Sequence, residues 1–171
     1  MKKYLLTCPR GLEEITKTNI SQYITQKSQV VNGGVEFQGH KKDMYKVNLE
    51  SRTGMHLLEK IFSIKIHEPK KLYSSIYNLQ WYKFIKPNTT FMIRTKIKSN
   101  LFNKSNTVTL KIKDAIVDNI RKKFGKRPSI NKESPDLSLH VIILENTLNI
   151  YINTSGKPLF KRGYRSKIHK A

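Results

Sequence analysis

The sequence has almost no cysteine and no long apolar run. Cys8 is the only cysteine among 171 residues, which excludes an internal disulfide framework and favours a reducing compartment. The first apolar run is short and ends at Pro9 and Arg10, so it is not long enough for a signal peptide. No segment approaches the roughly 20 consecutive apolar residues that a membrane-spanning helix needs. We therefore expect a cytoplasmic protein that does not insert into a membrane.

Carboxylates are scarce as well. Twelve Asp and Glu stand against 33 Lys and Arg, which gives a formal net charge of +21. Such an excess creates a positive field that attracts polyanions and releases their counterions on binding. Nucleic acid is the first candidate partner, and a membrane surface is the alternative, although no long basic amphipathic helix stands apart. Since 37% of the residues are hydrophobic, we expect a globular protein that binds nucleic acid.

Signatures of catalysis and of cofactor binding are also missing from the sequence. The eight glycines form no phosphate-binding or dinucleotide-binding pattern. The five histidines lie at no spacing typical of metal ligands. Glu13 and Glu14 fall in the first turn of an expected helix, where carboxylates favour the helix dipole. We assign no catalytic, cofactor-binding or metal-binding residue to this chain.

Strand and helix patterns alternate in residues 1–68. Asn32 and Gly33 form a strong turn signal between two β-rich runs, which predicts a hairpin. Met44 and Val47, with Leu49 as a further candidate, provide the apolar face of one helix, and Leu12, Ile15, Ile20 and Ile24 that of the other. The expected elements are a strand at 2–7, a helix at 12–24, a hairpin at 29–39, a helix at 41–51 and a strand at 57–68. The order βαββαβ predicts a ferredoxin-like domain.

A second set of helices and strands follows, so we expect an α+β protein of two units. The elements are a helical stretch at 70–85, a strand at 90–98, a helix at 107–124 with Gly125 as its cap, and paired strands at 139–144 and 148–152. In the strand at 90–98 one face is apolar and the other carries Arg94, Lys96 and Lys98. In the helix, apolar residues recur every three or four positions as far as Phe124.

Lysine, serine and asparagine gather where the strand at 90–98 leads into this helix. Lysines offer point charges to phosphates, and the Arg127 guanidinium can donate two hydrogen bonds to one phosphate. Hydroxyl and amide groups donate hydrogen bonds near a helix N-terminus. Solvation of the surface explains any single lysine equally well, but a whole cluster indicates a phosphate site. The candidate contacts in this region are Lys98, Ser99, Lys104, Ser105, Lys113 and Arg127.

Several segments of the chain resemble a known protein family. They are TCPRGLEEI, GGVEF, KIKDAIVDNIRKKFGKRPSIN, PDLSLHVII and YINTSGKPLFKRGYR, and the resemblance extends from Tyr4 to His169. These segments resemble the N-terminal part of the bacterial large-subunit rRNA guanine-N2 methyltransferases, which consists of a ferredoxin-like segment and a THUMP domain. The resemblance implies RNA binding, a ferredoxin-like domain at residues 1–68 and a THUMP domain with an α/β core at residues 69–165.

The resemblance also implies a catalytic domain beyond this sequence. In the family a Rossmann-like methyltransferase domain follows the RGYR stretch, so residues 166–171 would begin the linker to it. Arg162 and Arg165 lie at this exit and complete the set of expected RNA contacts. The chain holds neither a glycine-rich cofactor loop nor an Asn-Pro-Pro-Tyr-type motif. We expect it to present structured rRNA to a domain that uses S-adenosylmethionine to methylate a guanine of the large subunit.

Two alternatives stay open at this point. THUMP domains also occur in enzymes that thiolate or otherwise modify tRNA, so the bound RNA could be tRNA. The chain could instead be a stand-alone RNA-binding adaptor with no enzyme attached. Competition between tRNA and an rRNA hairpin would distinguish tRNA from rRNA as the ligand. The DNA sequence past codon 171 would test the second alternative.

Overall fold

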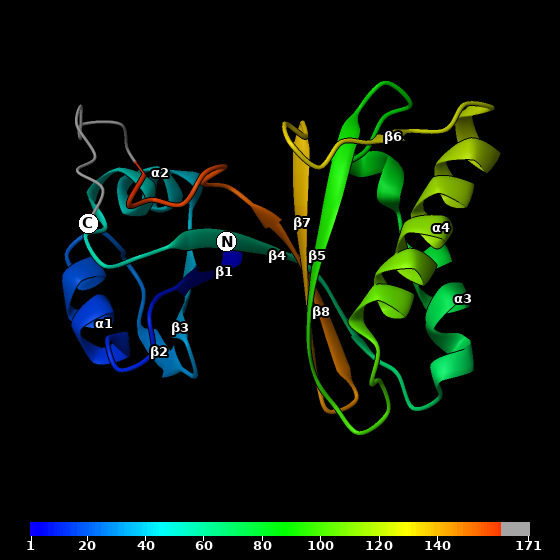
Figure 1. Ribbon diagram of the computed structural model, residues 1–171. Helices are drawn as coiled ribbons and strands as arrows, with labels where there is room; N and C mark the ends of the chain where they lie inside the picture. Colours follow the sequence, from blue (N-terminus) through cyan, green and yellow to red (C-terminus); the bar gives the residue numbers. More distant parts are fainter. Residues whose placement is uncertain (162–171) are drawn as a thin grey trace, which may run out of the picture. The chain divides into compact units, whose positions relative to one another are not determined.

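The chain forms two units, each with its own hydrophobic core. The computed structural model describes residues 1–161, which form two units (Figure 1). The first unit contains Met1–Lys60 together with residues 153–161, and the second contains Ile61–Ile152. Each unit has its own cluster of buried apolar side chains.

The first unit has the expected ferredoxin-like order βαββαβ. Its elements are β1 (Lys2–Thr7), α1 (Glu13–Ser21), β2 (Ser28–Val31), β3 (Gly34–Gly39), α2 (Lys41–Glu50) and β4 (His56–Lys65), whose second half belongs to the second unit. Its strand order is β2-β3-β1-β4, and the pairs β1 with β3, β1 with β4 and β2 with β3 are all antiparallel. The hairpin predicted from Asn32 and Gly33 is present, because β2 ends at Val31 and β3 begins at Gly34.

The helices of this unit bury fewer apolar residues than their sequence patterns predict. In α1 the buried residues are Thr16 and Ile20, whereas Ile15 is 56% exposed. In α2 Met44 and Val47 face the core as expected, but Leu49 is 68% exposed. Residues three or four positions apart share a helix face, so neighbours of a buried pair turn outward. The expectation that Ile15 and Leu49 contribute to the core is therefore wrong.

The Glu13 carboxylate holds two loops of the first unit. It accepts hydrogen bonds from the backbone N–H groups of Gly11, at 2.7 Å, and Gly33, at 3.1 Å. Both glycines have positive φ, 85° and 78°, a conformation that favours glycine. Backbone hydrogen bonds, first from its own N–H, together with the nearby Arg10 charge, lower the pKa of Glu13. The ionised carboxylate thus joins the β1–α1 loop to the β2–β3 turn.

Replacing this carboxylate by an amide is expected to make stability less dependent on pH. A carboxyl group with a depressed folded-state pKa stabilises the protein above its unfolded-state pKa, and loses this effect as the pH falls through the folded-state pKa. Glu13→Gln should therefore unfold at lower urea than wild type at pH ~7, with the difference shrinking as the carboxylate protonates. Urea melts across the acidic range measure this, with the exposed neighbour variant Glu14→Gln as control. A difference that stays constant with pH would contradict the assignment.

After the second unit the chain returns to the first. Leu159 donates its N–H to the Met55 carbonyl at 2.8 Å, and its side chain is buried in the first core. The Ser155 hydroxyl accepts the Leu57 N–H at 2.7 Å. The expected domain boundaries at residues 68 and 165 remain a proposal, and these contacts add the segment 153–161 to the first unit.

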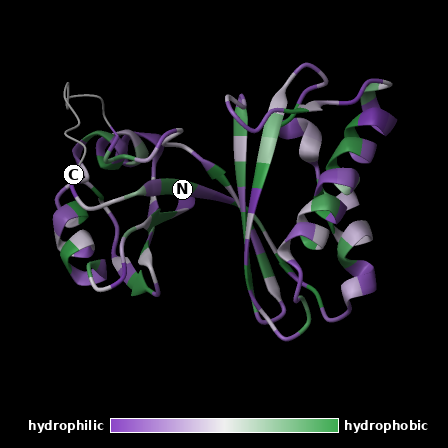
Figure 2. Ribbon diagram, viewed as in Figure 1, coloured by the Kyte–Doolittle hydropathy of each residue, from purple (hydrophilic) through white to green (hydrophobic). Residues whose placement is uncertain are grey.

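The second unit packs two α-helices against one face of a mixed sheet (Figure 1). The sheet order is β4-β8-β7-β5-β6, where β5 is parallel to β6 and β7, and β7 is antiparallel to β8. Figure 2 shows hydrophobic and hydrophilic residues alternating along the longer helix, α4. The elements are η1 (Pro69–Lys71), α3 (Leu72–Tyr77), η2 (Trp81–Lys83), β5 (Thr90–Lys98), α4 (Ser105–Phe124), β6 (Ser129–Ile130), β7 (Leu137–Leu144) and β8 (Thr147–Asn153).

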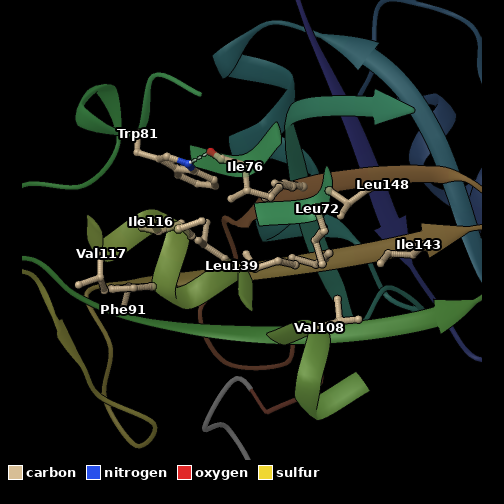
Figure 3. Close-up of a cluster of buried hydrophobic side chains, with 14 of the residues drawn as sticks. Leu72, Ile76, Trp81, Phe91, Val108, Ile116, Val117, Leu139, Ile143 and Leu148 are labelled. Carbon is tan, nitrogen blue, oxygen red and sulfur yellow. Dashed lines mark hydrogen bonds between the residues drawn. The ribbon is translucent and has the colours of Figure 1, made fainter. Parts of the chain in front are cut away.

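The helical stretch expected at 70–85 is broken into three short pieces. Hydrogen bonds from side chains replace the backbone hydrogen bonds that would continue the helix. The Trp81 indole N–H donates to the Ile76 carbonyl at 2.7 Å, as Figure 3 shows, and the Asn119 amide donates to the Tyr77 carbonyl at 2.7 Å. These bonds satisfy carbonyls at the end of α3, so the chain can turn and bury Trp81.

Candidate nucleic-acid interface

The second unit is strongly basic, and four of its six carboxylates are engaged by neighbouring side chains or backbone groups. Residues 61–152 hold 17 Lys and Arg but six Asp and Glu. Three of these carboxylates lie within ion-pair distance of cations, and Asp136 accepts hydrogen bonds from Thr90. The ion pairs are Glu68 with Lys71 at 2.7 Å, Asp114 with Lys113 at 2.7 Å and Asp118 with Arg121 at 2.9 Å. Most cations of this unit therefore face solvent and any approaching polyanion.

The start of α4 carries the α4 N-terminal cluster, which we define as Lys98, Ser99, Lys104 and Ser105. Lys104 is the N-cap residue of α4, but no side chain makes a capping hydrogen bond and the first turn contains no acid. The N–H groups of the first turn are therefore open to an anion, and the helix dipole favours one. Lys98 ends β5, where its carbonyl accepts the Glu145 N–H at 2.7 Å. The phosphate site expected at this cluster stays a prediction.

Ser99 has a different role from the one expected. Its hydroxyl donates to the Glu145 carbonyl and accepts the Leu101 N–H at 3.1 Å. The hydroxyl hydrogen is thus committed to the β7–β8 turn and is not available to a phosphate. Ser99 fixes the loop that carries Lys104, whereas the side chains of Lys104 and Ser105 are exposed.

Lys113 and Arg127 do not join this cluster. Lys113 lies two turns into α4, where its ammonium contacts the Asp114 carboxylate at 2.7 Å. Arg127 follows the opposite end of α4, beyond Gly125, whose φ of 71° ends the helix. A helix of 20 residues is about 30 Å long, so Lys104 and Arg127 cannot contact the same phosphate. The sequence suggested one cluster, and the structure separates it into two ends of one helix.

The basic face predicted for β5 is present. Arg94, Lys96 and Lys98 are exposed, whereas Phe91 is fully buried. The hydroxyls of Thr95 and Thr109 lie 2.6 Å apart, which shows that the other face of β5 packs against α4. The three cations therefore lie on the face of the sheet opposite the helices.

Two further lysines near the end of α4 were not predicted as functional residues. Lys122 lies 5.9 Å from the centre of the Tyr77 ring, and Lys123 lies 3.1 Å from that of Tyr82. These cation–π contacts join residues about 40 positions apart in the sequence, so no local pattern could reveal them. They hold α3 and η2 against α4 and fix the positions of two positive charges.

The remaining predictions concern two arginines near the end of the sequence, metal-binding groups and membrane-spanning helices. Arg162 and Arg165 fall outside residues 1–161. Within that range, no group of three or more His, Cys, Asp or Glu side chains is placed to hold a metal ion. No helix in the described part of the chain is long and apolar enough to cross a membrane.

Comparison with known proteins identifies both units. The THUMP domain family matches residues 67–153, and the RlmL ferredoxin-like domain matches residues 3–58. Both matches confirm the resemblance inferred from the sequence motifs.

Three solved structures share the fold. SMU.472, assigned as a methyltransferase and solved in complex with SAH, has 23% identity and a TM-score of 0.81 over 97% of this chain and 45% of its own. A Listeria monocytogenes protein assigned as an N6-adenine-specific DNA methylase has 23% identity and a TM-score of 0.82 over 99% and 44%. A 4-thiouridine synthetase in complex with RNA and ATP has 16% identity and a TM-score of 0.56 over 89% and 41%.

This chain therefore spans less than half the length of these proteins, and at such identities they show the fold alone. The THUMP match covers half of the chain. The chain thus belongs to the THUMP domain family, with an RlmL ferredoxin-like domain ahead of its THUMP domain.

Proposed function

We propose that this chain is the RNA-binding N-terminal region of a methyltransferase that uses S-adenosylmethionine to methylate a guanine of large-subunit rRNA. The observation that carries the proposal is that the matched THUMP domain contains the exposed cations of β5 and of both ends of α4. In this proposal the two units bind structured RNA and present it to a C-terminal catalytic domain of the full-length, cytoplasmic protein.

The relatives support individual parts of this proposal. The match to the RlmL ferredoxin-like domain supports a methyltransferase of the rRNA-modifying type. SMU.472 was solved with SAH, the product of S-adenosylmethionine-dependent methyl transfer, which supports that cofactor. The 4-thiouridine synthetase was solved with RNA, which supports RNA as the ligand. This chain spans 45% of SMU.472, so the catalytic domain is proposed to lie in the remainder of the full-length protein.

The described residues do not fit a binding site for S-adenosylmethionine. A glycine-rich loop that could cradle such a ligand is not present in residues 1–161, because the open glycines Gly11, Gly33, Gly125 and Gly156 lie in separate turns and the others pack against the chain's own atoms. A Cβ on Gly34 would lie 2.5 Å from the Leu6 carbonyl oxygen, and one on Gly54 would lie 2.6 Å from the Ser51 hydroxyl. We therefore assign no step of methyl transfer to these residues.

Binding is proposed to depend on phosphates and on the shape of the RNA helix. The deep major groove of A-form RNA hides the base edges, so cations of this kind contact phosphates and 2′-hydroxyl groups. Lys104 and Arg127 lie about 30 Å apart along α4, so a duplex can contact both only if it extends that far. Because DNA lacks the 2′-hydroxyl groups, RNA should bind more tightly than DNA of the same sequence.

Removing one cation at each end of α4 is expected to weaken RNA binding in a defined way. Lys104→Ala and Arg127→Ala should each flatten the plot of log affinity against log salt by roughly one unit, and the double variant by roughly two. Both residues are exposed, so stability should change by less than about 0.5 kcal/mol. Fluorescence anisotropy with an rRNA hairpin over a series of salt concentrations measures the slope.

Lys71→Ala is the matched control, because it removes the same charge from a lysine already paired with Glu68. Its slope should stay close to that of wild type. A double variant that binds as tightly as wild type, with an unchanged slope, would place the phosphate contacts elsewhere. Competition between the rRNA hairpin, tRNA and DNA then identifies the ligand: we expect the hairpin to compete best. Stronger competition by tRNA would replace rRNA with tRNA in the proposal.

A further inference from the structure

Phe124, the last residue of α4, is exposed although its position in the helix predicts burial. It follows the fully buried Ile116 and Ile120 at intervals of four residues, which places it on the same helix face. Its side chain is nevertheless 44% exposed. A large aromatic ring that faces solvent at the end of a buried stripe is available to a ligand.

The chain on either side of Phe124 is rich in cations. Residues 121–132 contain six Lys and Arg and no carboxylate. Arg121, Lys122 and Lys123 lie in the last turn of α4, where cations stabilise the helix dipole. Lys126 and Arg127 lie past Gly125, beyond that turn, and neither has an ion pair within residues 1–161. The helix dipole therefore explains neither these two cations nor the exposure of the ring.

The segment that carries these cations is held at both ends. The Gly125 N–H donates to the Arg121 carbonyl at 2.8 Å and ends the helix. Five residues later, Ile130 pairs with Phe91 of β5, and the Asn131 N–H donates to the Phe91 carbonyl at 3.1 Å. Pro128 is buried between these two points. A ligand that binds here need not order a flexible loop, which reduces the entropic cost of binding.

We propose that Phe124, Lys126 and Arg127 form a binding site for an unpaired RNA nucleotide. The base stacks on the exposed Phe124 ring, while Lys126 and Arg127 contact the flanking phosphates. Every nucleobase has a flat π-face, so stacking tolerates any sequence, but bases inside a duplex are already stacked on one another. The site therefore selects single-stranded RNA. This inference rests on the proposed RNA binding and adds a contact that distinguishes single strands from duplexes.

The test compares variants of Phe124 on two RNA ligands by fluorescence anisotropy. One ligand is a single-stranded RNA of about ten nucleotides, and the other is a blunt duplex of the same length. Phe124→Ala should weaken binding of the single strand by about fivefold or more, because one stacked base contributes at least about that factor. Phe124→Trp should bind the single strand as wild type does, since it retains an aromatic face. Phe124→Leu should bind as weakly as Phe124→Ala, because it keeps an apolar side chain but has no π-face.

Binding of the duplex should be the same for all four proteins. Thermal unfolding should also be similar, because the ring is already partly exposed. If wild type binds neither RNA, the proposed function fails and this inference fails with it. If wild type binds both RNAs but Phe124→Ala binds the single strand equally well, this inference alone is overturned. Wild-type affinity in Phe124→Leu would also overturn it, because an apolar contact, as with a protein partner, would then replace base stacking.

Discussion

Raising the salt concentration from about 50 to about 200 mM is expected to weaken binding of structured RNA by on the order of a thousandfold. Each cation that neutralises a phosphate releases a condensed counterion, so log affinity falls linearly with log salt. About six contacts suffice for a loss of this size. The second unit offers more exposed cations than that, on β5 and at both ends of α4. The steepness follows from a charge of +21 with few unpaired carboxylates in that unit.

Fluorescence anisotropy of an rRNA hairpin across a potassium chloride series measures this dependence. Circular dichroism at each salt concentration is the control, since it shows that the protein stays folded while affinity falls. The Lys104→Ala and Arg127→Ala variants should give shallower lines than wild type. An affinity that does not change over this range would show that phosphate contacts do not dominate binding, and the proposed interface would then be wrong.

Replacing Trp81 by alanine is expected to destabilise the second unit by about 3–5 kcal/mol. The indole is fully buried among apolar side chains from the sheet and α4 (Figure 3). It also packs edge-on against Phe62, with ring centres 5.2 Å apart. Alanine removes these contacts, leaves a cavity and deprives the Ile76 carbonyl of its indole donor. Urea unfolding followed by far-UV circular dichroism measures the loss.

Trp81→Phe is the matched control for this prediction. Phenylalanine keeps an aromatic ring in the core but cannot donate to the Ile76 carbonyl. It should therefore cost less than alanine, with about 0.5–1.5 kcal/mol coming from the lost indole hydrogen bond, because the Ile76 carbonyl still accepts the Leu79 N–H. We expect the two units to unfold in separate transitions, of which only that of the second unit should shift. A Trp81→Ala protein as stable as wild type would contradict the packing described for this core.

Local patterns predicted most elements because the information lies within a few residues. The alternation in TFMIRTKIK predicts β5 and its basic face, and both are present. The apolar spacing up to Ile120 and the glycine after Phe124 predict α4 and its end. Asn32 and Gly33 predict the first hairpin. In each case the backbone geometry of one element requires the observed residue type, so the neighbouring sequence is sufficient.

The errors occurred where contacts between distant residues decide the outcome. The stretch at 70–85 has the apolar content of a helix, but the Asn119 amide, 42 positions from Tyr77, donates to the Tyr77 carbonyl at the end of α3. The phosphate contact predicted for Ser99 stays a prediction, but the local sequence could not show that its hydroxyl donates to the Glu145 carbonyl in another turn. Sequence periodicity places Phe124 in the core, yet its side chain is 44% exposed.

The sequence by itself determined the charge, the order of the elements and the family, because composition, periodicity and short motifs are local properties. The predicted helix between Lys104 and Arg127 also keeps these two residues apart, because a helix rises by about 1.5 Å per residue. Only the tertiary structure decided which distant residues lie together. Ser155 and Leu57 are 98 positions apart in sequence, yet they meet at 2.7 Å through a hydrogen bond. Distance along a helix follows from the sequence, whereas such long-range contacts depend on how whole elements pack.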